Sequence, residues 1–376
     1  MKTDEKNIRD FDGIRACLRS FGRLHGRWGR RRQLRQKKVY KIGVSQLVEH
    51  PALDAAYDGF VDGLKEKGYV DGDNIELDFN NAQNEQSNCV TIANKLVGNK
   101  SDLILAIGTT AAVAVAQATQ DIPVLITAIT DPKDAGLVKS NEKPNTNVTG
   151  TSDLTPVKQQ IALIPRILPN AKTVGFLYSS SESNSEFIVN LAKTEAKKIG
   201  LKTVEKTISN SNEIQQAAKA LVPLCDVIYL PNDNTIASGM ATVTQVTKPA
   251  KKPIITGERG MMDIGGIATY NTNYYNLGKQ TALMAVDILV NGKKPADMPI
   301  QYQQTFELVL NKSFAKDIGV TFPQDVLDEE KSFASSSAAA GSGSGSSGSS
   351  AGSSPSAPSA GSSQSGSSAT SAKSSS

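Results

Sequence analysis

Short apolar runs alternate with longer amphipathic stretches along the chain from residue 39 onward. The apolar runs have the length and composition of buried strands, and the stretches between them have the spacing of helices. This alternation is typical of a parallel sheet covered by helices on both faces. In the first half of the body it predicts strands at 41–46, 74–82, 103–107 and 122–130, and helices at 52–68, 88–99 and 111–118.

The same order of elements is then repeated. The segment 171–180 corresponds to the first strand, 225–239 to the third strand with its following turn, and 251–258 to the fourth strand. Equivalent positions such as Ile42 and Val174 lie about 130 residues apart. The repeat predicts two similar lobes, each built on a Rossmann-like sheet.

Further elements follow the repeat: a strand at 265–271, a helix at 274–292 and an extended segment at 299–311. They indicate that the chain recrosses between the lobes, and several crossings make a hinge. We therefore predict an α/β fold of two Rossmann-like lobes with parallel sheets, joined by a multi-crossing hinge, with a cleft at the carboxyl ends of the strands. Lobe 1 is expected at 39–152, completed by about 272–302, and lobe 2 at 153–271, completed by about 303–331.

Composition separates both ends of the chain from this body. Residues 1–38 hold 13 Lys or Arg against 4 Asp or Glu, which predicts a basic and disordered arm. Residues 332–376 are rich in Ser, Gly and Ala and are expected to form a disordered tail. Residues 39–334 carry a net charge of −6, which argues against nucleic acid as a partner. No signal peptide and no membrane-spanning run is visible in the sequence.

The turn at 108–110 joins an apolar strand to a run of helix-forming residues. Gly108, Thr109 and Thr110 would present unpaired backbone N–H groups, two hydroxyls and the positive end of a helix dipole. Such a turn suits a small anion. The glycine spacing of nucleotide-binding loops is missing, and a simple helix start remains the alternative.

The polar residues at the predicted strand ends are hydroxyls, amides and carboxylates. The body has no Gly-x-Ser-x-Gly motif and only one histidine, His50, so we expect no enzyme. The cysteines lack metal-ligand spacing, and we expect no metal and no other cofactor. The same groups suit an amino acid, with its carboxylate at Thr109 and Thr110 and its ammonium at Asp233 or Glu258. Asp233 and Asn234 as a plain helix cap remain the alternative.

Seven segments in order carry a resemblance to a known family, among them "GVSQLVEHPALDAAYDGFVDGLKEKGY", "LILAIGTTAAVAVAQAT", "ITAITDPKDAGLV" and "YLPNDNTIAS". Together with "NVTGTSD", "FLYSSSESNS" and "GGIATYNTNYYNLGKQTA" they resemble the ABC-transporter substrate-binding proteins assigned to tryptophan and tyrosine uptake. The resemblance covers about residues 39–330. It implies a periplasmic-binding-protein type I fold and capture of an L-amino acid, aromatic by expectation, in the cleft between closing lobes.

The resemblance also implies partners, a location and ligand contacts. The partners are a membrane permease and its ATPase, and the location is the outer face of a Gram-positive membrane, reached through a lipid anchor that this sequence does not show. We expect a monomer. The implied ligand contacts are Gln46, Glu49, Thr109, Thr110, Thr127, Asp153, Asn184, Asp233, Asn234 and Glu258.

A ligand-responsive transcription regulator with the same two-lobe body remains the alternative function. The basic residues 1–38 favour it, and the missing helix-turn-helix pattern disfavours it.

Overall fold

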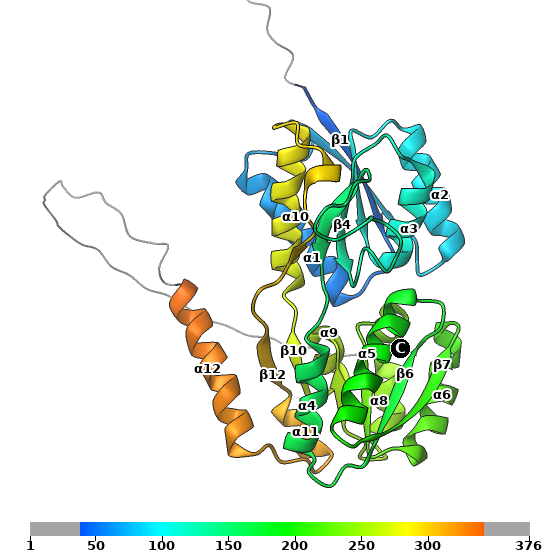
Figure 1. Cartoon of the computed structure of the whole chain (residues 1–376), viewed down its shortest axis with the longest axis vertical. Helices are drawn as coiled ribbons and strands as arrows, with labels where there is room; N and C mark the ends of the chain where they lie inside the picture. Colours follow the sequence, from blue (N-terminus) through cyan, green and yellow to red (C-terminus); the bar gives the residue numbers. More distant parts are fainter. Residues whose placement is uncertain (1–37, 342–376) are drawn as a thin grey trace, which may run out of the picture. The chain divides into compact units, whose positions relative to one another are not determined.

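The computed structural model describes residues 38–341, with side chains to residue 333. The chain divides into two compact units at Pro323 and Gln324. The first unit contains two α/β lobes, each a six-stranded sheet with helices on both faces (Figure 1). The second unit begins with helix α12, Gln324–Gly341. The predicted basic arm lies outside the described residues, except for Lys38.

The sheet of lobe 1 has the strand order β11-β5-β4-β3-β1-β2, and all its neighbours are parallel. Its central strands are fully buried apolar runs, as the sequence predicts. The strands are β1 (Tyr40–Gln46), β2 (Ile75–Asn81), β3 (Leu103–Ile107), β4 (Val124–Ile129), β5 (Val148–Ser152) and β11 (Gln301–Tyr302). The helices are α1 (Pro51–Glu66), α2 (Gln86–Gly98), α3 (Thr109–Ala118) and α10 (Tyr274–Leu289), with a short 3-10 turn at Pro295–Asp297.

The sheet of lobe 2 has the equivalent order β12-β10-β9-β8-β6-β7, with β12 antiparallel to β10. The strands are β6 (Thr173–Ser179), β7 (Lys202–Ile208), β8 (Val227–Leu230), β9 (Ile254–Thr256), β10 (Ala268–Asn271) and β12 (Glu307–Leu310). The helices are α4 (Val157–Ile167), α5 (Ser183–Lys198), α6 (Ile214–Leu221), α7 (Asn234–Ser238), α8 (Met240–Thr247), α9 (Arg259–Gly265) and α11 (Lys312–Asp317). The 3-10 turns Ser211–Glu213 and Val222–Leu224 flank α6.

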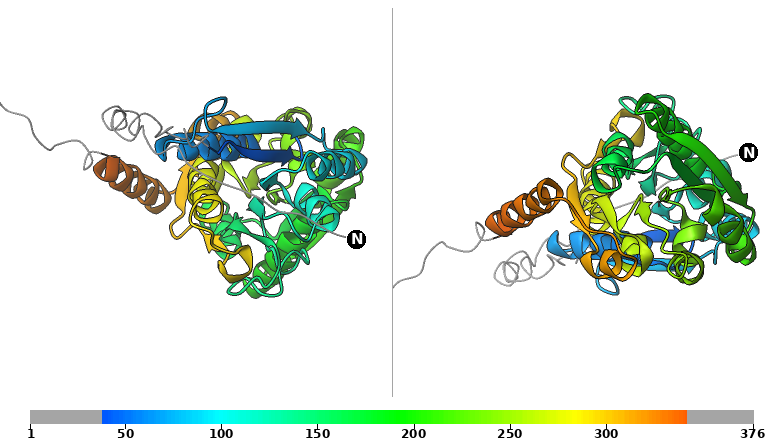
Figure 2. Two further views of the ribbon diagram at one scale, coloured as in Figure 1. Left: turned by 90° about the horizontal axis from the view of Figure 1, so that it is seen from above. Right: turned by 90° about the horizontal axis from the view of Figure 1, so that it is seen from below.

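The chain passes between the two sheets at 152–157, 271–274 and 302–307. These crossings lie side by side in the views of Figure 1 and Figure 2. The predicted architecture of two parallel-sheet lobes and a multi-crossing hinge is therefore confirmed. The extended segment predicted at 299–311 differs from the structure, because the third crossing divides it into β11 in one sheet and β12 in the other.

Glycines on both helices allow α10 to pack closely against α1. A methyl group on Gly59 would lie 2.0 Å from the carbonyl oxygen of Tyr275, and one on Gly278 would lie 1.9 Å from that of Ala56. Neither position tolerates a side chain, so the two backbones approach closely. The buried residues of α10 accordingly belong to the core of lobe 1, although α10 follows lobe 2 in the chain.

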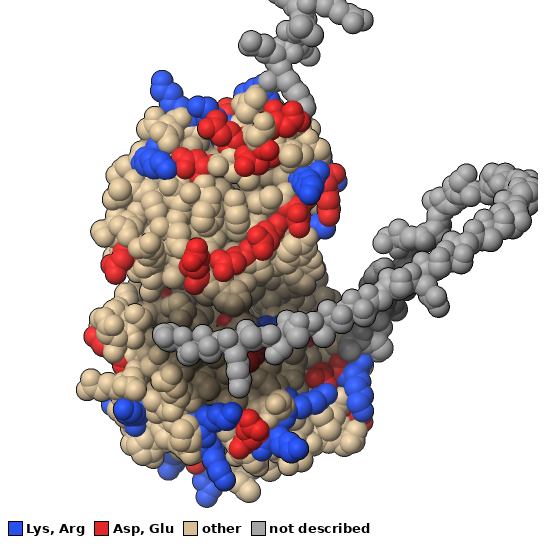
Figure 3. All heavy atoms as spheres, turned by 180° about the vertical axis from the view of Figure 1, so that it is seen from behind, with Lys and Arg blue, Asp and Glu red and all other residues tan. Residues whose placement is uncertain are grey.

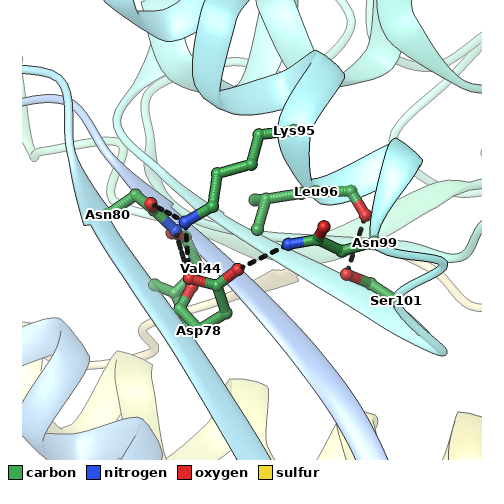
Figure 4. A network of polar contacts seen from close by, with 7 residues as sticks. All are labelled: Val44, Asp78, Asn80, Lys95, Leu96, Asn99 and Ser101. Carbon is green, nitrogen blue, oxygen red and sulfur yellow. Dashed lines mark hydrogen bonds and ion pairs between the residues drawn. The ribbon is translucent and has the colours of Figure 1, made fainter.

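A polar network on lobe 1 holds α2 against the edge strand β2 (Figure 4). The Lys95 ammonium donates to Asp78 Oδ1 at 2.9 Å and to Asn80 Oδ1 at 2.7 Å, and Asn99 donates to Asp78 Oδ2 at 3.1 Å. Burial opposes ionisation of Asp78, but these hydrogen bonds outweigh it and lower the pKa of the carboxyl. The network is charge-assisted and partly exposed, so it stabilises the lobe only modestly.

The prediction of a disordered tail at 332–376 is wrong for residues 332–341, which are helical. Helix α12 continues to Gly341, through the segment "SFASSSAAAG". Alanine has the highest helix propensity of all residues, and this outweighs the serines near the end of the helix. Residues 342–376 lie outside the described part of the chain.

Candidate functional site

Loops from both lobes meet at the carboxyl ends of the strands and enclose a small cavity, which we name the interlobe cavity. Lobe 1 contributes the loops after β1, β4 and β5, and lobe 2 those after β6, β8 and β9. The space between the side chains is about 10 Å³, enough for about one water molecule. The lining residues are His50, Leu53, Ala128, Thr130, Asp153, Asn184, Asn232, Asp233, Asn234, Ala237, Glu258 and Tyr274.

Asp153 is the link between the two walls of this cavity. Its Oδ2 accepts hydrogen bonds from the Tyr274 hydroxyl at 2.8 Å and from Asn232 Nδ2 of lobe 2 at 3.0 Å. Its Oδ1 accepts a long hydrogen bond from Thr130 at 3.4 Å. Burial raises the pKa of the Asp153 carboxyl, against the lowering effect of these donors. An ionised Asp153 is therefore short of positive charge, and a cation near Oδ1 would stabilise it.

A β-bulge in β4 decides which side chains of lobe 1 reach the cavity. The pairing of β4 with β5 shifts between Ile126 and Ile129, and Ala128 has a left-handed backbone with φ of 56°. The bulge turns Ala128 toward the cavity. Thr127 instead accepts a hydrogen bond from Thr151 at 2.9 Å inside lobe 1 and does not line the cavity.

Lobe 2 contributes three buried carboxylates, Glu182, Asp233 and Glu258, each directly before a helix. Asp233 accepts from the backbone N–H of Ile236 at 2.8 Å and of Ser179 at 2.6 Å. Burial, and next the nearby Glu182 carboxylate, raise the pKa of Asp233. Glu258 accepts from the N–H groups of Gly260 and Met261 at the start of α9, and burial raises its pKa as well. The predicted capping role of Asp233 is thus present in the structure.

Three cavity-lining side chains hold a buried polar atom without a hydrogen-bond partner: Asn184 Oδ1, Asn232 Oδ1 and His50 Nδ1. Asn232 turns its NH₂ group to Asp153, which leaves its oxygen free. The NH₂ group of Asn234 donates to Glu182 at 2.6 Å, which leaves Asn234 Oδ1 facing His50 Nε2 at 3.1 Å. Because an amide oxygen only accepts, His50 Nε2 must carry the hydrogen of this bond. The unpartnered amide oxygens of Asn184 and Asn232 are acceptors.

The predicted ligand contacts divide into two groups. Asp153, Asn184, Asp233, Asn234 and Glu258 come together in the interlobe cavity. Gln46 and Glu49 do not line the cavity. Gln46 is buried, and its side-chain NH₂ group donates to Val48 O and to Asp54 Oδ1. Glu49 is exposed.

Thr109 and Thr110 line a different pocket, which we name the hydroxyl pocket. Its volume is about 150 Å³, and it is lined by Thr109 and Thr110 of lobe 1 and by Ser181 and Ser183 of lobe 2, among others. The predicted turn exists: Gly108 precedes α3 with φ of 93°, and no side chain caps the helix. The two threonines thus face serines across the lobes rather than Asp233 and Asn234.

Sequence reasoning missed His50, Thr130, Asn232 and Tyr274 as parts of the site. Tyr274 stands at the start of α10, directly after a crossing, and reaches Asp153 at a separation of 121 residues. The sequence offers His50 as the one histidine of the body, without the motif of a catalytic base. Its position before Pro51, at the start of a helix that follows a strand end, was the available signal.

The described residues contain no group of three or more His, Cys, Asp or Glu side chains placed to hold a metal ion. Among the same residues, no helix has both the length and the apolar character needed to cross a membrane. The cavity offers no lysine or arginine in its lining, so its charge is acidic. On the face that Figure 3 draws, most lysines and arginines lie away from the hollow between the lobes.

Comparison with known proteins identifies the family. A family model described as ABC transporter substrate binding protein matches residues 41–333. The tyrosine-binding protein of Clostridioides difficile is 45% identical over 280 residues, which cover 74% of this chain and 81% of that protein. Structures at 12 to 17% identity, including a transcription regulator of Lactococcus lactis with a TM-score of 0.53, share the fold alone.

Two solved structures at higher identity bear on the arrangement of the lobes. One is a domain from Streptococcus pneumoniae in complex with L-Trp, with 44% identity, a TM-score of 0.76 and coverage of 78% of this chain and 98% of that one. The other is the ligand-free, open structure of a substrate binding protein with adhesive properties from Clostridium difficile, with 46% identity, a TM-score of 0.60 and coverage of 76% and 96%. At nearly equal identity, this chain superposes better on the L-Trp complex than on the open structure, as the TM-scores show.

Substrate-binding proteins of ABC importers act in the periplasm or outside the cell, and they capture solutes without transforming them. The extent of the family match and the identity to its relatives leave the regulator alternative less well supported. The two-lobe fold, the polar cavity between the lobes and these matches agree, and this chain belongs to the ABC transporter substrate-binding proteins.

Proposed function

We propose that this protein binds an aromatic L-amino acid between its lobes and delivers it to an ABC permease. The observation that carries the proposal is the pair of unpartnered acceptors in the interlobe cavity, Asn184 Oδ1 and Asn232 Oδ1, beside the carboxylate of Asp153. A buried acceptor without a donor costs free energy. A ligand that brings several N–H donors and a positive charge removes this cost.

The α-ammonium group of an amino acid meets this requirement. It has three N–H donors and one positive charge, and it would bind to Asp153 Oδ1 and to the amide oxygens near it. The raised pKa of Asp153 marks a carboxylate that lacks a compensating charge in the protein. Asp233 and Glu258 add negative potential but already accept backbone N–H groups.

The carboxylate end of the ligand is proposed to lie at the N-terminus of α3. The hydroxyl pocket contains Thr109 and Thr110, and its residue Ser183 is followed in the chain by Asn184 of the interlobe cavity. An uncapped helix N-terminus is favourable for an anion. The predicted contacts at Gln46, Glu49 and Thr127 have no such geometric support.

The aromatic part of the proposal draws on relatives. A curated relative is named for tyrosine, and a structure at 44% identity holds L-Trp. In the cavity, Leu53, Ala128 and Ala237 supply apolar surface and Tyr274 an aromatic ring. A permease with its ATPase, a monomeric receptor and a lipid anchor at the outer face of the membrane complete the proposal, all by likeness to the family.

Calorimetry and thermal shift with the full chain test this function. We expect L-Trp, L-Tyr or L-Phe to bind, and a ligand at 100 times its Kd to add about 2.7 kcal/mol to the stability. Tryptamine, which lacks the carboxylate, and indole-3-propionate, which lacks the ammonium, should each bind more weakly than L-Trp. Absence of binding by all three aromatic amino acids would overturn the proposal. Replacing both Thr109 and Thr110 with Val should weaken L-Trp more than tryptamine if the carboxylate lies at α3.

A further inference from the structure

The two lobes also contact each other outside the interlobe cavity, through Asn84. This residue lies in the loop between β2 and α2, and its Nδ2 donates to Thr235 Oγ1 of lobe 2 at 2.9 Å. Neither residue lines the cavity. The contact therefore joins the lobes without being part of the proposed ligand site.

The direction of this hydrogen bond is set by Glu182. The Thr235 hydroxyl is 2.7 Å from Glu182 Oε1, and because a carboxylate only accepts, the hydroxyl hydrogen points to Glu182. Thr235 Oγ1 then offers a lone pair to Asn84. The Glu182 carboxylate also accepts from the backbone N–H of Thr235 at 2.8 Å, and it is 3% exposed. Lobe 2 thus holds its acceptor in one fixed orientation.

Lobe 1 holds the donor in place as well. Asn84 and its neighbour Gln83 both have left-handed backbones, with φ of 62° and 55°. The N–H of Asn84 donates to Leu47 O at 2.8 Å, which ties the loop to the end of β1. Asparagine adopts this conformation at low cost, and two consecutive left-handed residues are maintained only where the surroundings demand it.

We propose that Asn84 and Thr235, oriented by Glu182, form a latch that retains a bound ligand by holding the lobes together. Asn84 and Glu182 are positioning residues, because neither lines the cavity; Glu182 orients Thr235 and also accepts from the lining residue Asn234. The inference rests on the proposed function, since it requires a ligand held between the lobes. A pre-oriented donor and acceptor lose little conformational freedom when the lobes meet, so the bond favours the closed arrangement.

The test compares two glycine variants of the same loop in the full chain. Asn84→Gly removes the amide and keeps a residue suited to positive φ, and Gln83→Gly makes the same backbone change at an exposed neighbour. Stopped-flow release of L-Trp, L-Tyr and L-Phe gives the dissociation rates. We expect Asn84→Gly to speed release about two- to tenfold, the value of one hydrogen bond, by the same factor for each ligand. Gln83→Gly should release at the wild-type rate.

A double-mutant cycle separates the latch from general weakening of the fold. Thr235→Val removes the acceptor, and adding Asn84→Gly to it should produce no further increase in rate. The melting temperatures of the two ligand-free glycine variants should agree. An unchanged release rate in Asn84→Gly, or additive effects in the double variant, would overturn the latch.

If the proposed function is wrong, the wild-type protein does not bind aromatic amino acids, and no release rate can be measured. The latch is then judged by small-angle scattering of the ligand-free proteins. A larger radius of gyration for Asn84→Gly than for Gln83→Gly supports it, and equal radii for the wild type and both variants overturn it.

Discussion

Replacing Asp153 with Asn should weaken amino-acid binding while leaving the contact between the lobes in place. The amide has nearly the shape of the carboxylate. The oxygen of the introduced amide can accept from Tyr274 and Asn232, as Asp153 Oδ2 does at 2.8 and 3.0 Å. The NH₂ group then takes the place of Asp153 Oδ1 and faces Thr130 Oγ1 at about 3.4 Å. The substitution thus removes one negative charge and one acceptor from the cavity and little else.

The expected loss of affinity follows from the kind of contact that is removed. A hydrogen bond to a charged group contributes about 1.5–3 kcal/mol, so Kd for an aromatic amino acid should rise about 10- to 150-fold. Stability should change in the opposite direction. Burial raises the pKa of Asp153, so the ionised carboxylate destabilises the ligand-free fold, and the neutral amide avoids this cost.

Calorimetry at pH 7 measures the affinity, and urea unfolding of the ligand-free protein measures the stability. Asp121→Asn, at an exposed position outside the cavity, is the matched control and should change neither quantity. Wild-type affinity in Asp153→Asn would refute the assignment of the ammonium seat. Reduced affinity together with a large fall in stability would show that Asp153 supports the fold rather than the ligand.

Three further predictions follow from the structure. Burial raises the pKa values of Asp153 and Glu258 above those of the unfolded chain, so their contribution to stability falls as the pH rises through the folded-state values. The ligand-free protein should therefore gain stability as the pH is lowered toward the pKa values of the unfolded chain. Affinity should fall over the same range, and binding there should release protons, which calorimetry in buffers of different ionisation enthalpy measures. Gly278→Ala should lower the free energy of unfolding in urea by about 1–3 kcal/mol, because the new methyl would lie 1.9 Å from Ala56 O. The control Gly98→Ala meets no atom within 4 Å, so it should be neutral or raise the stability by up to about 1 kcal/mol. Equal effects of the two substitutions would contradict the close approach of α1 and α10. Lys100→Gly should stabilise by about 1 kcal/mol, since Lys100 is exposed with φ of 56°, and Lys100→Ala should not share the gain.

The apolar strands could be predicted from the sequence, and a strand with buried hydroxyls could not. The run at β3 is continuously apolar and that at β4 is interrupted only by Thr127, and the structure has strands at both. Strand β5, Val148–Ser152, is as fully buried but contains two threonines, and we did not predict it. Thr149 donates to Met298 O and Thr151 to Thr127 Oγ1, so both hydroxyls are satisfied inside the core. Hydropathy cannot detect such pairing, because the partners lie far apart in the sequence.

The candidate site shows the same limit. Asp153, Asn184, Asp233, Asn234 and Glu258 follow predicted strands or belong to motifs of the family, and they share one cavity. Asn232 and Tyr274 matter through bonds to Asp153, at sequence separations of 79 and 121 residues, which only the approach of the two lobes creates. Thr127 was misplaced because a bulge shifts the alternation of side chains along β4, and no residue pattern announced that bulge.

The return of α10 and β11 to lobe 1 has a consequence for the synthesis of the protein. The core of lobe 1 includes Leu277, Ala282 and Ile300, which leave the ribosome after β6 to β10 of lobe 2. A nascent chain that ends before residue 274 lacks the helix that covers Gly59 of α1. Lobe 1 therefore cannot complete its core as an independent N-terminal domain, and its folding waits until residues 274–302 are present.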